Sequence, residues 1–219
     1  MTSIVALDQA VTIAANSLHS EYFDHLFPII TRTTTWLPTL IVLLYVIIRT
    51  WGKRSLAIIV LLALAIVLAD QVSSALIKPL VCRLRPTHDP DTAPFIHIVN
   101  NYRGGLYGFV SSHAANSFAV ATLTSLLLRN RYYTIAITLW AAITSYSRIY
   151  LGVHFVGDIL CGAALGIGIA LVLYYLNYFF YKKYYNTKYT THTTTSHNRL
   201  LTLTLVANVA IVAIVAIFY

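Results

Sequence analysis

Long apolar runs separated by short polar segments are the main feature of the chain. The runs cover residues 28–48, 55–77, 111–128, 132–146, 154–180 and 200–218. A helix of about 20 apolar residues crosses the hydrocarbon core of a bilayer, and it satisfies its own backbone hydrogen bonds there. The pattern therefore predicts an all-α polytopic membrane protein, a bundle of six transmembrane helices.

A shorter, weakly amphipathic segment over residues 4–18 precedes these runs. It is too short to span a bilayer, so we expect a short interfacial helix at the N-terminus. The N-terminus lacks the basic region, apolar core and cleavage site of a secretory signal, so we expect it to be retained. Because the spans use nearly all of the chain, residues 1–219 are predicted to form a single membrane-embedded domain.

Composition supports this interpretation. The chain is 58% hydrophobic and 10% charged, whereas soluble domains contain about 25% charged residues. Its net charge of +8 would favour nucleic-acid binding in a soluble protein, but here the position of the cations relative to the spans matters more, and no nucleic-acid partner is expected. Cys82 and Cys161 have neither disulfide-framework nor metal-site spacing, so both are expected to be unpaired thiols.

The cations indicate the orientation of the chain. The connectors 49–54, 129–131 and 181–199 hold three, two and four Lys or Arg residues, nine of the fifteen in the chain. Cytoplasmic loops of membrane proteins are enriched in such residues. These connectors are therefore expected to be cytoplasmic, with 181–199 a solvated segment rich in Tyr, Thr and Lys, and the N-terminus and the loop 78–107 are expected outside.

Three polar clusters occur at the predicted outer ends of spans two to five. They are Lys78 with Arg85-Pro86, Ser111-Ser112-His113, and Ser147-Arg148 followed by His154 and Asp158. Phosphoryl transfer spreads negative charge over oxygens that need several fixed cationic donors. Lys78, Arg85 and Arg148 supply such cations, and Ser111 can add a hydroxyl donor. The clusters together predict a phosphate site that requires no metal or other cofactor.

Two histidines suit the chemistry of such a site. His154 and Asp158 are four residues apart at the start of an apolar helix, so the carboxylate can hold one imidazole nitrogen while the other faces the substrate. His113, on a different helix, can protonate the leaving oxygen, because imidazole titrates near neutral pH.

Each residue also has a simpler interpretation. Lys78 or Arg85 alone could be a snorkelling anchor, Ser111 a helix N-cap and His154 an interfacial ring. Their joint spacing at one predicted face favours the phosphate site.

Other polar residues near the clusters are less decisive. Asp70 shares a predicted helix face with Lys78, and it could tune the site or be satisfied by neighbouring hydroxyls. Asn116, one turn from His113, is expected to make an interhelical hydrogen bond rather than a substrate contact. Arg83 and Arg103 are interpreted as solvated or interfacial charges rather than lipid contacts.

The three clusters resemble the signature of the phosphatidic acid phosphatase type 2 superfamily, and the resemblance extends over residues 78–158. It implies phosphoryl transfer through a phosphohistidine on His154 with Asp158 assisting. It further implies that Lys78, Arg85, Ser111 and Arg148 bind phosphate and that His113 is the general acid. Members of similar size have six membrane helices and an active site facing away from the cytoplasm.

The middle cluster departs from the pattern of this family. The family usually has Pro-Ser-Gly-His, whereas this chain has Val110-Ser111-Ser112-His113. A side chain at residue 112 restricts close approach and positive φ angles, so the backbone contribution at this position is in doubt. Ser112, like Asp70 and Asn116, is a candidate for the surroundings of the site.

These features lead us to expect a lipid phosphatase of the bacterial inner membrane, active at the periplasmic or exterior side on a lipid delivered laterally from the bilayer. The chain resembles bacterial members of this family in its compact size and short loops, and this resemblance implies undecaprenyl diphosphate as the leading substrate, with lipid A and phosphatidylglycerol phosphate as alternatives. A phosphotransferase would use the same residues, and a vanadate-dependent oxidase is disfavoured. An anionic-lipid transporter without hydrolysis would need polar groups near the midplane of the membrane, and the polar clusters lie at one face only. The sequence does not predict the oligomeric state.

Overall fold

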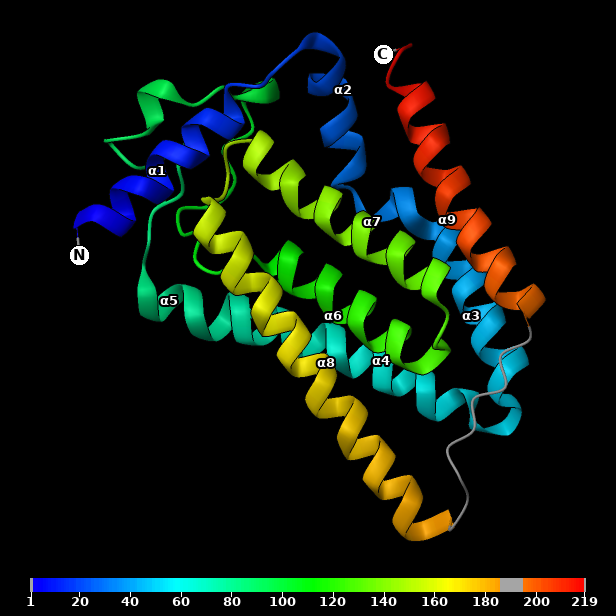
Figure 1. Cartoon of the computed structure of the whole chain (residues 1–219). Helices are drawn as coiled ribbons and strands as arrows, with labels where there is room; N and C mark the ends of the chain where they lie inside the picture. Colours follow the sequence, from blue (N-terminus) through cyan, green and yellow to red (C-terminus); the bar gives the residue numbers. More distant parts are fainter. Residues whose placement is uncertain (1, 186–194, 219) are drawn as a thin grey trace.

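The computed structural model describes residues 2–185 and 195–218. Its helices are α1 (Thr2–Asn16), α2 (Glu21–Ile30), α3 (Leu37–Trp51), α4 (Ser55–Asp70), α5 (Lys78–Val81), α6 (Ser112–Leu128), α7 (Arg131–Tyr150), α8 (Val156–Tyr185) and α9 (Thr195–Val215) (Figure 1). Short 3-10 turns lie at Thr33–Trp36, Gly52–Arg54, Ala93–Phe95 and Val99–Asn101, and a π-helical segment, η3, covers Gln71–Ile77. The only extended pairing in the described part of the chain is an isolated bridge between Leu84 and Tyr107. The all-α prediction is therefore confirmed.

Each of the six apolar runs coincides with a helix, but several boundaries differ from the prediction. Residues 28–30 belong to α2, and α3 begins only at Leu37, where Pro38 occupies a first-turn position that suits its missing N–H group. The helix of the fifth apolar run, α8, starts at Val156, so His154 lies in the turn before this helix. Of the expected connector 181–199, residues 186–194 lie outside the described residues, and the others belong to α8 and α9.

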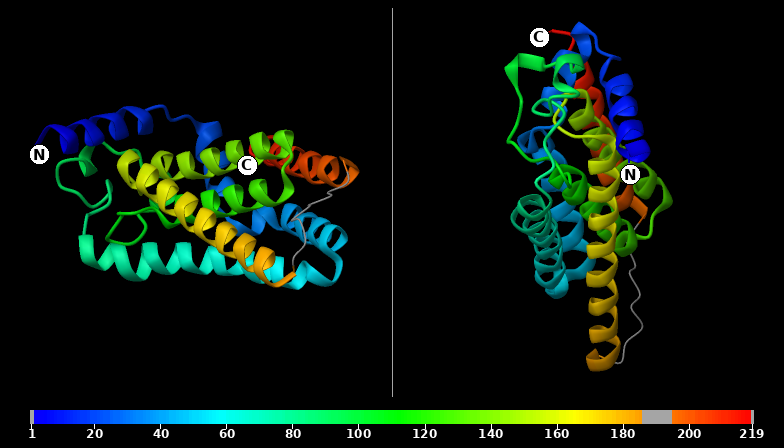
Figure 2. Two further views of the ribbon diagram at one scale, coloured as in Figure 1. Left: turned by 60° about the horizontal axis from the view of Figure 1, so that its bottom comes forward. Right: turned by 90° about the vertical axis from the view of Figure 1, so that its left-hand side faces the viewer.

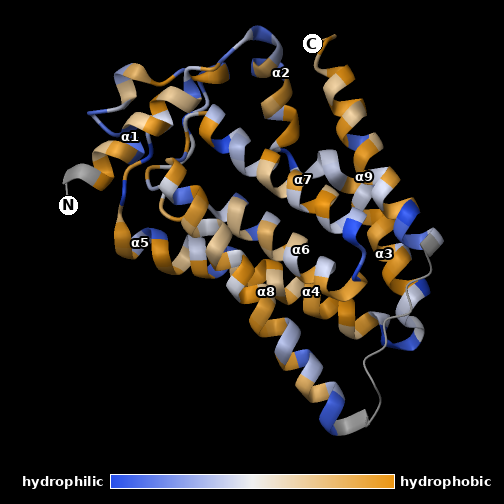
Figure 3. Ribbon diagram, in the orientation of Figure 1, coloured by the Kyte–Doolittle hydropathy of each residue, from blue (hydrophilic) through white to orange (hydrophobic). Residues whose placement is uncertain are grey.

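Three helical segments are long and apolar enough to cross a membrane: Thr33–Val81, Val156–Lys183 and Ser196–Val215. The first contains a chain reversal, because Gly52 (φ 54°) ends α3 and α4 follows as the second arm of a hairpin. Large apolar side chains such as Leu56, Leu176 and Leu203 are exposed on these helices, and hydrophobic residues make up much of their length (Figure 3). Such a surface suits lipid rather than water. The chain is accordingly a membrane protein.

Two glycines bring α6 and α8 into close contact. A Cβ atom added to Gly162 would lie 2.5 Å from the Ser111 carbonyl oxygen, and one added to Gly166 would lie 2.1 Å from the Ala115 carbonyl oxygen. Small residues at a spacing of four allow helix backbones to approach in membranes, and α6 presents buried alanines such as Ala115 at this contact. The close approach aligns the N-terminal ends of the two helices, where His113 and Asp158 are located.

The apolar core has two main parts. The larger part joins α3, α4, α6, α7, α8 and α9. The smaller part packs α2 and the end of α9 around Tyr150, Leu151 and Val153, so the residues just before His154 are fixed by buried packing. The C-terminal end of α8 extends beyond the rest of the bundle, at the end of the helix opposite Asp158 (Figure 2).

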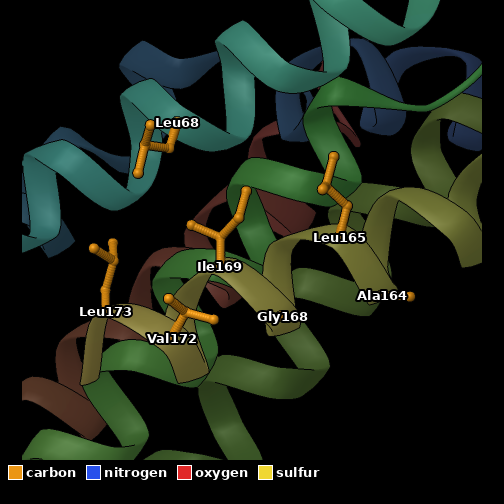
Figure 4. Close-up of a pocket in the computed structure, with 7 residues that line it drawn as sticks. All are labelled: Leu68, Ala164, Leu165, Gly168, Ile169, Val172 and Leu173. Atoms are coloured by element: carbon orange, nitrogen blue, oxygen red, sulfur yellow. The ribbon is translucent and has the colours of Figure 1, made fainter. Parts of the chain in front are cut away.

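A wholly apolar groove of about 320 Å³ lies between α4 and α8. Its lining side chains come from Leu68 of α4 and from five residues of α8, and Gly168 also lines it (Figure 4). The groove begins at Ala164, six residues after Asp158 along α8, which corresponds to about 9 Å of helix.

Candidate active site

Five elements meet at one end of the bundle and carry the residues of the three polar clusters. They are α5, the loop between α5 and α6, the N-terminal ends of α6 and α8, and the C-terminal end of α7 with the turn that follows it (Figure 1). The structure thus brings together residues that are up to 80 positions apart, from Lys78 to Asp158.

His154 and Asp158 form the buried centre of this region. The imidazole Nδ1 lies 3.4 Å from Asp158 Oδ2, and the two side chains are 2% and 0% exposed. The same carboxylate oxygen accepts a hydrogen bond from the Phe155 amide at 3.0 Å. The predicted histidine–aspartate contact is therefore present, and the carboxylate fixes the turn that carries the histidine.

Gly108 lies directly against this pair. A Cβ atom at Gly108 would lie 2.8 Å from Asp158 Oδ2 and 3.6 Å from His154 Nδ1. The imidazole also makes a hydrogen bond with the Gly108 backbone. The absence of a side chain at residue 108 thus gives the histidine a backbone partner as well as a carboxylate.

Arg83 occupies the second oxygen of the buried carboxylate. Its Nη1 atom donates to Asp158 Oδ1 at 2.9 Å, and its Nη2 atom donates to Asp8 Oδ2 at 2.7 Å. The guanidinium carbon also lies 4.0 Å from the centre of the Phe155 ring. The expectation that Arg83 is a solvated or interfacial charge is wrong, because the fold of the loop turns its side chain toward α8.

Arg148, at the end of α7, is 3% exposed. Its Nη1 atom donates to Thr31 Oγ1 at 2.8 Å and its Nη2 atom donates to the Tyr102 hydroxyl at 3.1 Å. Its Nε atom is buried and has no hydrogen-bond partner. A buried cationic donor without an acceptor is costly, so this group is available to an incoming anion.

Arg85 is held by backbone oxygens. Its Nε atom donates to the Tyr107 carbonyl at 3.1 Å and its Nη1 atom donates to the Val153 carbonyl at 3.3 Å. Gly104, at φ 68°, passes so close that an added Cβ atom would lie 2.6 Å from Nη1. These contacts orient the guanidinium without neutralising its charge.

Lys78 follows the π-helical segment η3 and donates a hydrogen bond to Ser112 Oγ. The Ser74 hydroxyl lies 2.8 Å from the same oxygen. A π-helical segment shifts the register of the helix that follows it and often occurs at functional sites. Ser112, which replaces the glycine of the family pattern, is thereby the anchor of Lys78.

Ser111 and His113 lie at the start of α6. The Ser111 hydroxyl accepts a hydrogen bond from the Ala114 amide as the N-cap of the helix, and the Ser111 amide donates to the Asp158 carbonyl at 3.0 Å. His113 interacts electrostatically with Arg148 and His154. The predicted cluster therefore faces the histidine–aspartate pair from the neighbouring helix.

Two candidate residues lie further from the centre. Asp70 interacts electrostatically with Lys78, and its carboxylate accepts a hydrogen bond from the Gln71 side chain at 3.5 Å. The prediction that Asn116 makes an interhelical hydrogen bond is wrong for its side-chain oxygen, because this atom is buried and has no hydrogen-bond partner in the structure.

The site carries an excess of positive charge. In the described ranges 2–185 and 195–218, no carboxylate lies within ion-pairing distance of Lys78, Arg85 or Arg148, which we call the cationic cluster. Burial, followed by the positive charges of Arg85 and Arg148, lowers the pKa of His154 well below its usual range. His154 is therefore neutral at pH 7, with a nitrogen lone pair available.

Several residues around the site could not be found by sequence reasoning. Asp8, Thr31, Arg83, Tyr102 and Gly108 come from segments whose spacing to the motifs carries no periodic signal. The only sequence feature that pointed to this part of the site was the group of glycines near residue 108, in an otherwise apolar and aromatic stretch. The residues described by the structure contain no group of three or more His, Cys, Asp or Glu side chains arranged to hold a metal.

Fold and site together define a membrane-embedded phosphatase, a hydrolase acting on phosphate esters. The model of the PAP2 superfamily matches residues 55–182, more than half of the chain. The chain belongs to the PAP2 superfamily, as its three clusters predicted.

Characterised relatives are similar over most of the chain. A lipid A 4'-phosphatase from Bacteroides thetaiotaomicron is 39% identical over 162 residues, which cover 73% of this chain and 72% of the relative. A lipid A 4'-phosphatase from Porphyromonas gingivalis is 34% identical over 175 residues, with 80% and 74% covered. The chain is therefore a membrane lipid phosphatase.

The fold itself has been observed before. The crystal structure of a PAP2-type phosphatidylglycerolphosphate phosphatase from Bacillus subtilis superposes with a TM-score of 0.60, at 21% identity, covering 84% of this chain and 89% of the other.

Proposed function

We propose that this phosphatase hydrolyses a phosphate monoester on the head group of lipid A, through a phosphohistidine on His154. The observation that carries the proposal is the cationic cluster. Lys78, Arg85 and Arg148 lie beside the buried His154–Asp158 pair without a counter-ion in the described chain. A phosphate dianion is the ligand that best matches such a group of donors.

In the first step, the free nitrogen of His154 attacks phosphorus and the bond from phosphorus to the lipid oxygen breaks. Asp158 stabilises the positive charge that forms on the imidazole. His113, protonated in the complex with the phosphate dianion, gives its proton to the leaving oxygen, so the lipid departs as a neutral alcohol. The cationic cluster neutralises the charge on the phosphoryl oxygens, with Ser111 as a further donor.

In the second step, water attacks the phosphohistidine, and the bond between nitrogen and phosphorus breaks. His113, now unprotonated, accepts the proton of this water. Inorganic phosphate leaves and His154 returns to its neutral state, so the reaction needs no further reactant.

The choice of lipid rests on the relatives. Two lipid A 4'-phosphatases, 39% and 34% identical over more than 70% of both chains, favour lipid A over undecaprenyl diphosphate, which the family resemblance had placed first. Both lipids carry a phosphate on an apolar anchor, so the experiment below compares both as substrates. The groove between α4 and α8 could take an acyl chain of a lipid entering sideways (Figure 4).

The proposed arrangement in the membrane has six crossings: α3, α4 with η3, α6, α7, α8 and α9. The site then faces the periplasm or exterior of the bacterial inner membrane, with the connectors 49–54 and 129–131 in the cytoplasm. The exposed apolar side chains of α1, among them Ile4, Leu7 and Val11, support an interfacial position for this helix.

Phosphate release by purified, detergent-solubilised protein tests the function. The panel is lipid A, undecaprenyl diphosphate, phosphatidylglycerol phosphate and phosphatidic acid, and each lipid is given to wild type and to His154→Ala. We expect release to be fastest from lipid A and to disappear in the variant. Release that requires an added acceptor lipid would indicate a phosphotransferase, and equal, negligible release from both proteins on every lipid would favour an anionic-lipid transporter.

The native thiols test the orientation. Cys82 is exposed at the end of α5, on the proposed outer side. In spheroplasts of a Cys161→Ser strain, a membrane-impermeant maleimide should label Cys82. Labelling only after the membrane is opened would place the site on the cytoplasmic side.

A further inference from the structure

The buried face of α1 is polar, and its exposed face is apolar. Asp8, Thr12 and Asn16, which we call the polar stripe, are spaced four apart and therefore share one side of the helix. Thr12 and Asn16 are fully buried. Buried polar side chains persist where they have partners, so the contacts of the polar stripe indicate what α1 does.

Asn16 holds the end of α7. Its Nδ2 atom donates to the Tyr150 carbonyl at 2.7 Å and to the Ile149 carbonyl at 3.2 Å. Its Oδ1 atom accepts from the His97 amide at 2.7 Å. The last carbonyls of a helix lack partners within the helix. Here the Asn16 side chain donates to the Tyr150 carbonyl, and it adds a second donor to the Ile149 carbonyl, which also accepts from the Gly152 amide.

Thr12 and Asp8 hold the start of α8. The Val156 amide donates to Thr12 Oγ1 at 3.1 Å, and the Gly157 amide donates to Asp8 Oδ1 at 2.8 Å. A Cβ atom at Gly157 would lie 2.7 Å from Asp8 Oδ2, so the glycine allows the close approach. The first amides of α8 thus find acceptors on a helix that is about 145 residues away in the sequence.

The two sets of contacts flank the turn that carries His154. Residues 151–155 join α7 to α8, Arg148 lies before this turn and Asp158 follows it. Asp8 additionally contacts Arg83, which in turn contacts Asp158. One helix therefore fixes both ends of the turn and also connects to the carboxylate of the histidine–aspartate pair.

We propose that α1 positions the reacting histidine, and that Asp8, Thr12 and Asn16 are positioning residues for His154 and Asp158. Displacing reacting groups by about 1 Å can reduce a rate about 100-fold, and reacting groups have to be held to within about 0.5 Å. The cations of the cationic cluster come from other elements. Loss of the polar stripe therefore lowers kcat while leaving KM nearly unchanged. This inference rests on the proposed function.

The test compares Asp8→Ala, Asp8→Asn and Thr12→Val with wild type in the full-length, detergent-solubilised protein. The matched control is Gln9→Ala, because Gln9 lies on the same helix and its side chain makes no hydrogen bond in the described structure. We expect kcat for phosphate release to fall about 10- to 100-fold in Asp8→Ala and less in Thr12→Val, with KM within about threefold of wild type. Asp8→Asn keeps an acceptor for the Gly157 amide, so it should recover part of the rate.

Hydrogen exchange of the peptide covering residues 150–160 is the second readout, because it does not depend on activity. Exchange at Val156 and Gly157 should increase in Asp8→Ala and Thr12→Val and stay near wild type in Gln9→Ala. Thr12→Val nearly preserves side-chain volume, so this variant tests the positioning role if Asp8→Ala does not fold. Wild-type kcat in Thr12→Val and Asp8→Ala, or loss of rate entirely through KM, would overturn the proposal.

The two proposals fail in different ways. If wild type and His154→Ala both release no phosphate, the proposed function is wrong, and unchanged exchange in the variants would then overturn the positioning role as well. If wild type is active and the polar-stripe variants match it in rate, only the positioning role is wrong.

Discussion

The guanidinium of Arg83 lies 2.9 Å from one oxygen of Asp158, while His154 lies 3.4 Å from the other oxygen of that carboxylate. The buried carboxylate thus balances one cation and orients one imidazole. Removing one partner of a buried ion pair costs about 3–5 kcal/mol, because the remaining charge is left unpaired.

Arg83→Gln should therefore lower kcat about 10- to 100-fold, with only a small change in KM. Arg83→Lys should lower kcat less than Arg83→Gln, since lysine keeps the positive charge but can bind only one of the two carboxylates well. Steady-state kinetics on the preferred lipid measures both. Unchanged kcat together with a lower melting temperature would mean that Arg83 serves stability alone.

Gly108→Ala should abolish most of the activity. The new methyl group would lie 2.8 Å from Asp158 Oδ2, so the carboxylate or the loop has to move. Gly105→Ala is the matched control, because nothing lies within 4 Å of a Cβ atom there and Gly105 is not among the positive-φ glycines. Phosphate release should fall at least about tenfold in the first variant and stay near wild type in the second. Equal rates would contradict the close packing of Gly108 on the site.

Ser112→Ala and Ser112→Gly separate two roles of the residue that replaces the family glycine. Both remove the hydroxyl that accepts from Lys78, and only glycine restores backbone freedom. If the hydroxyl matters because it orients Lys78, both variants should raise KM about two- to tenfold. Competition by inorganic phosphate should weaken in parallel. A change in Ser112→Gly alone would assign the effect to the backbone instead.

Arg148→Lys should raise KM about tenfold or more. Lysine cannot keep the contacts to Thr31 and Tyr102 and also present a second donor to phosphate, whereas the arginine has its Nε atom free. Arg32→Lys is the control, since Arg32 is exposed and its side chain makes no hydrogen bond in the residues that the structure describes. Inhibition by orthovanadate measures binding independently of turnover, and it should weaken only in Arg148→Lys.

The pH profile should reflect a neutral His154. Burial and the charges of Arg85, Arg148 and Lys78 lower its pKa, while Asp158 is the carboxylate facing it. Protonation removes the attacking lone pair, so the acid limb of kcat/KM that arises from His154 should lie well below pH 6.5, the usual pKa of histidine. The profile is measured from about pH 4.5 to about pH 8. The ionisation of the substrate is titrated separately by phosphorus NMR, and an acid limb at or above pH 6.5 would refute the assignment.

Much of the site could be predicted from the sequence, because its residues occur in local motifs. His154 and Asp158 are four residues apart in the chain, and the neighbouring cations occur at spacings typical of the family. The apolar runs likewise predicted that these segments are helical, since a helix satisfies its own backbone hydrogen bonds within each segment separately. These features depend only on distances along the chain.

The tertiary structure decided the contacts between distant segments. Arg83 reaches the Asp158 carboxylate from the start of the motif region, and Asp8, which lies far before that region, reaches Arg83. Gly108 is required only because a loop passes over that carboxylate. The start of α8 at Val156 and the π-helical segment before Lys78 likewise depend on packing. Such contacts have no sequence periodicity, because the position of one segment against another is set by the packing of the whole bundle. The sequence by itself therefore determined which residues can carry the chemistry, and the fold determined what holds them in place.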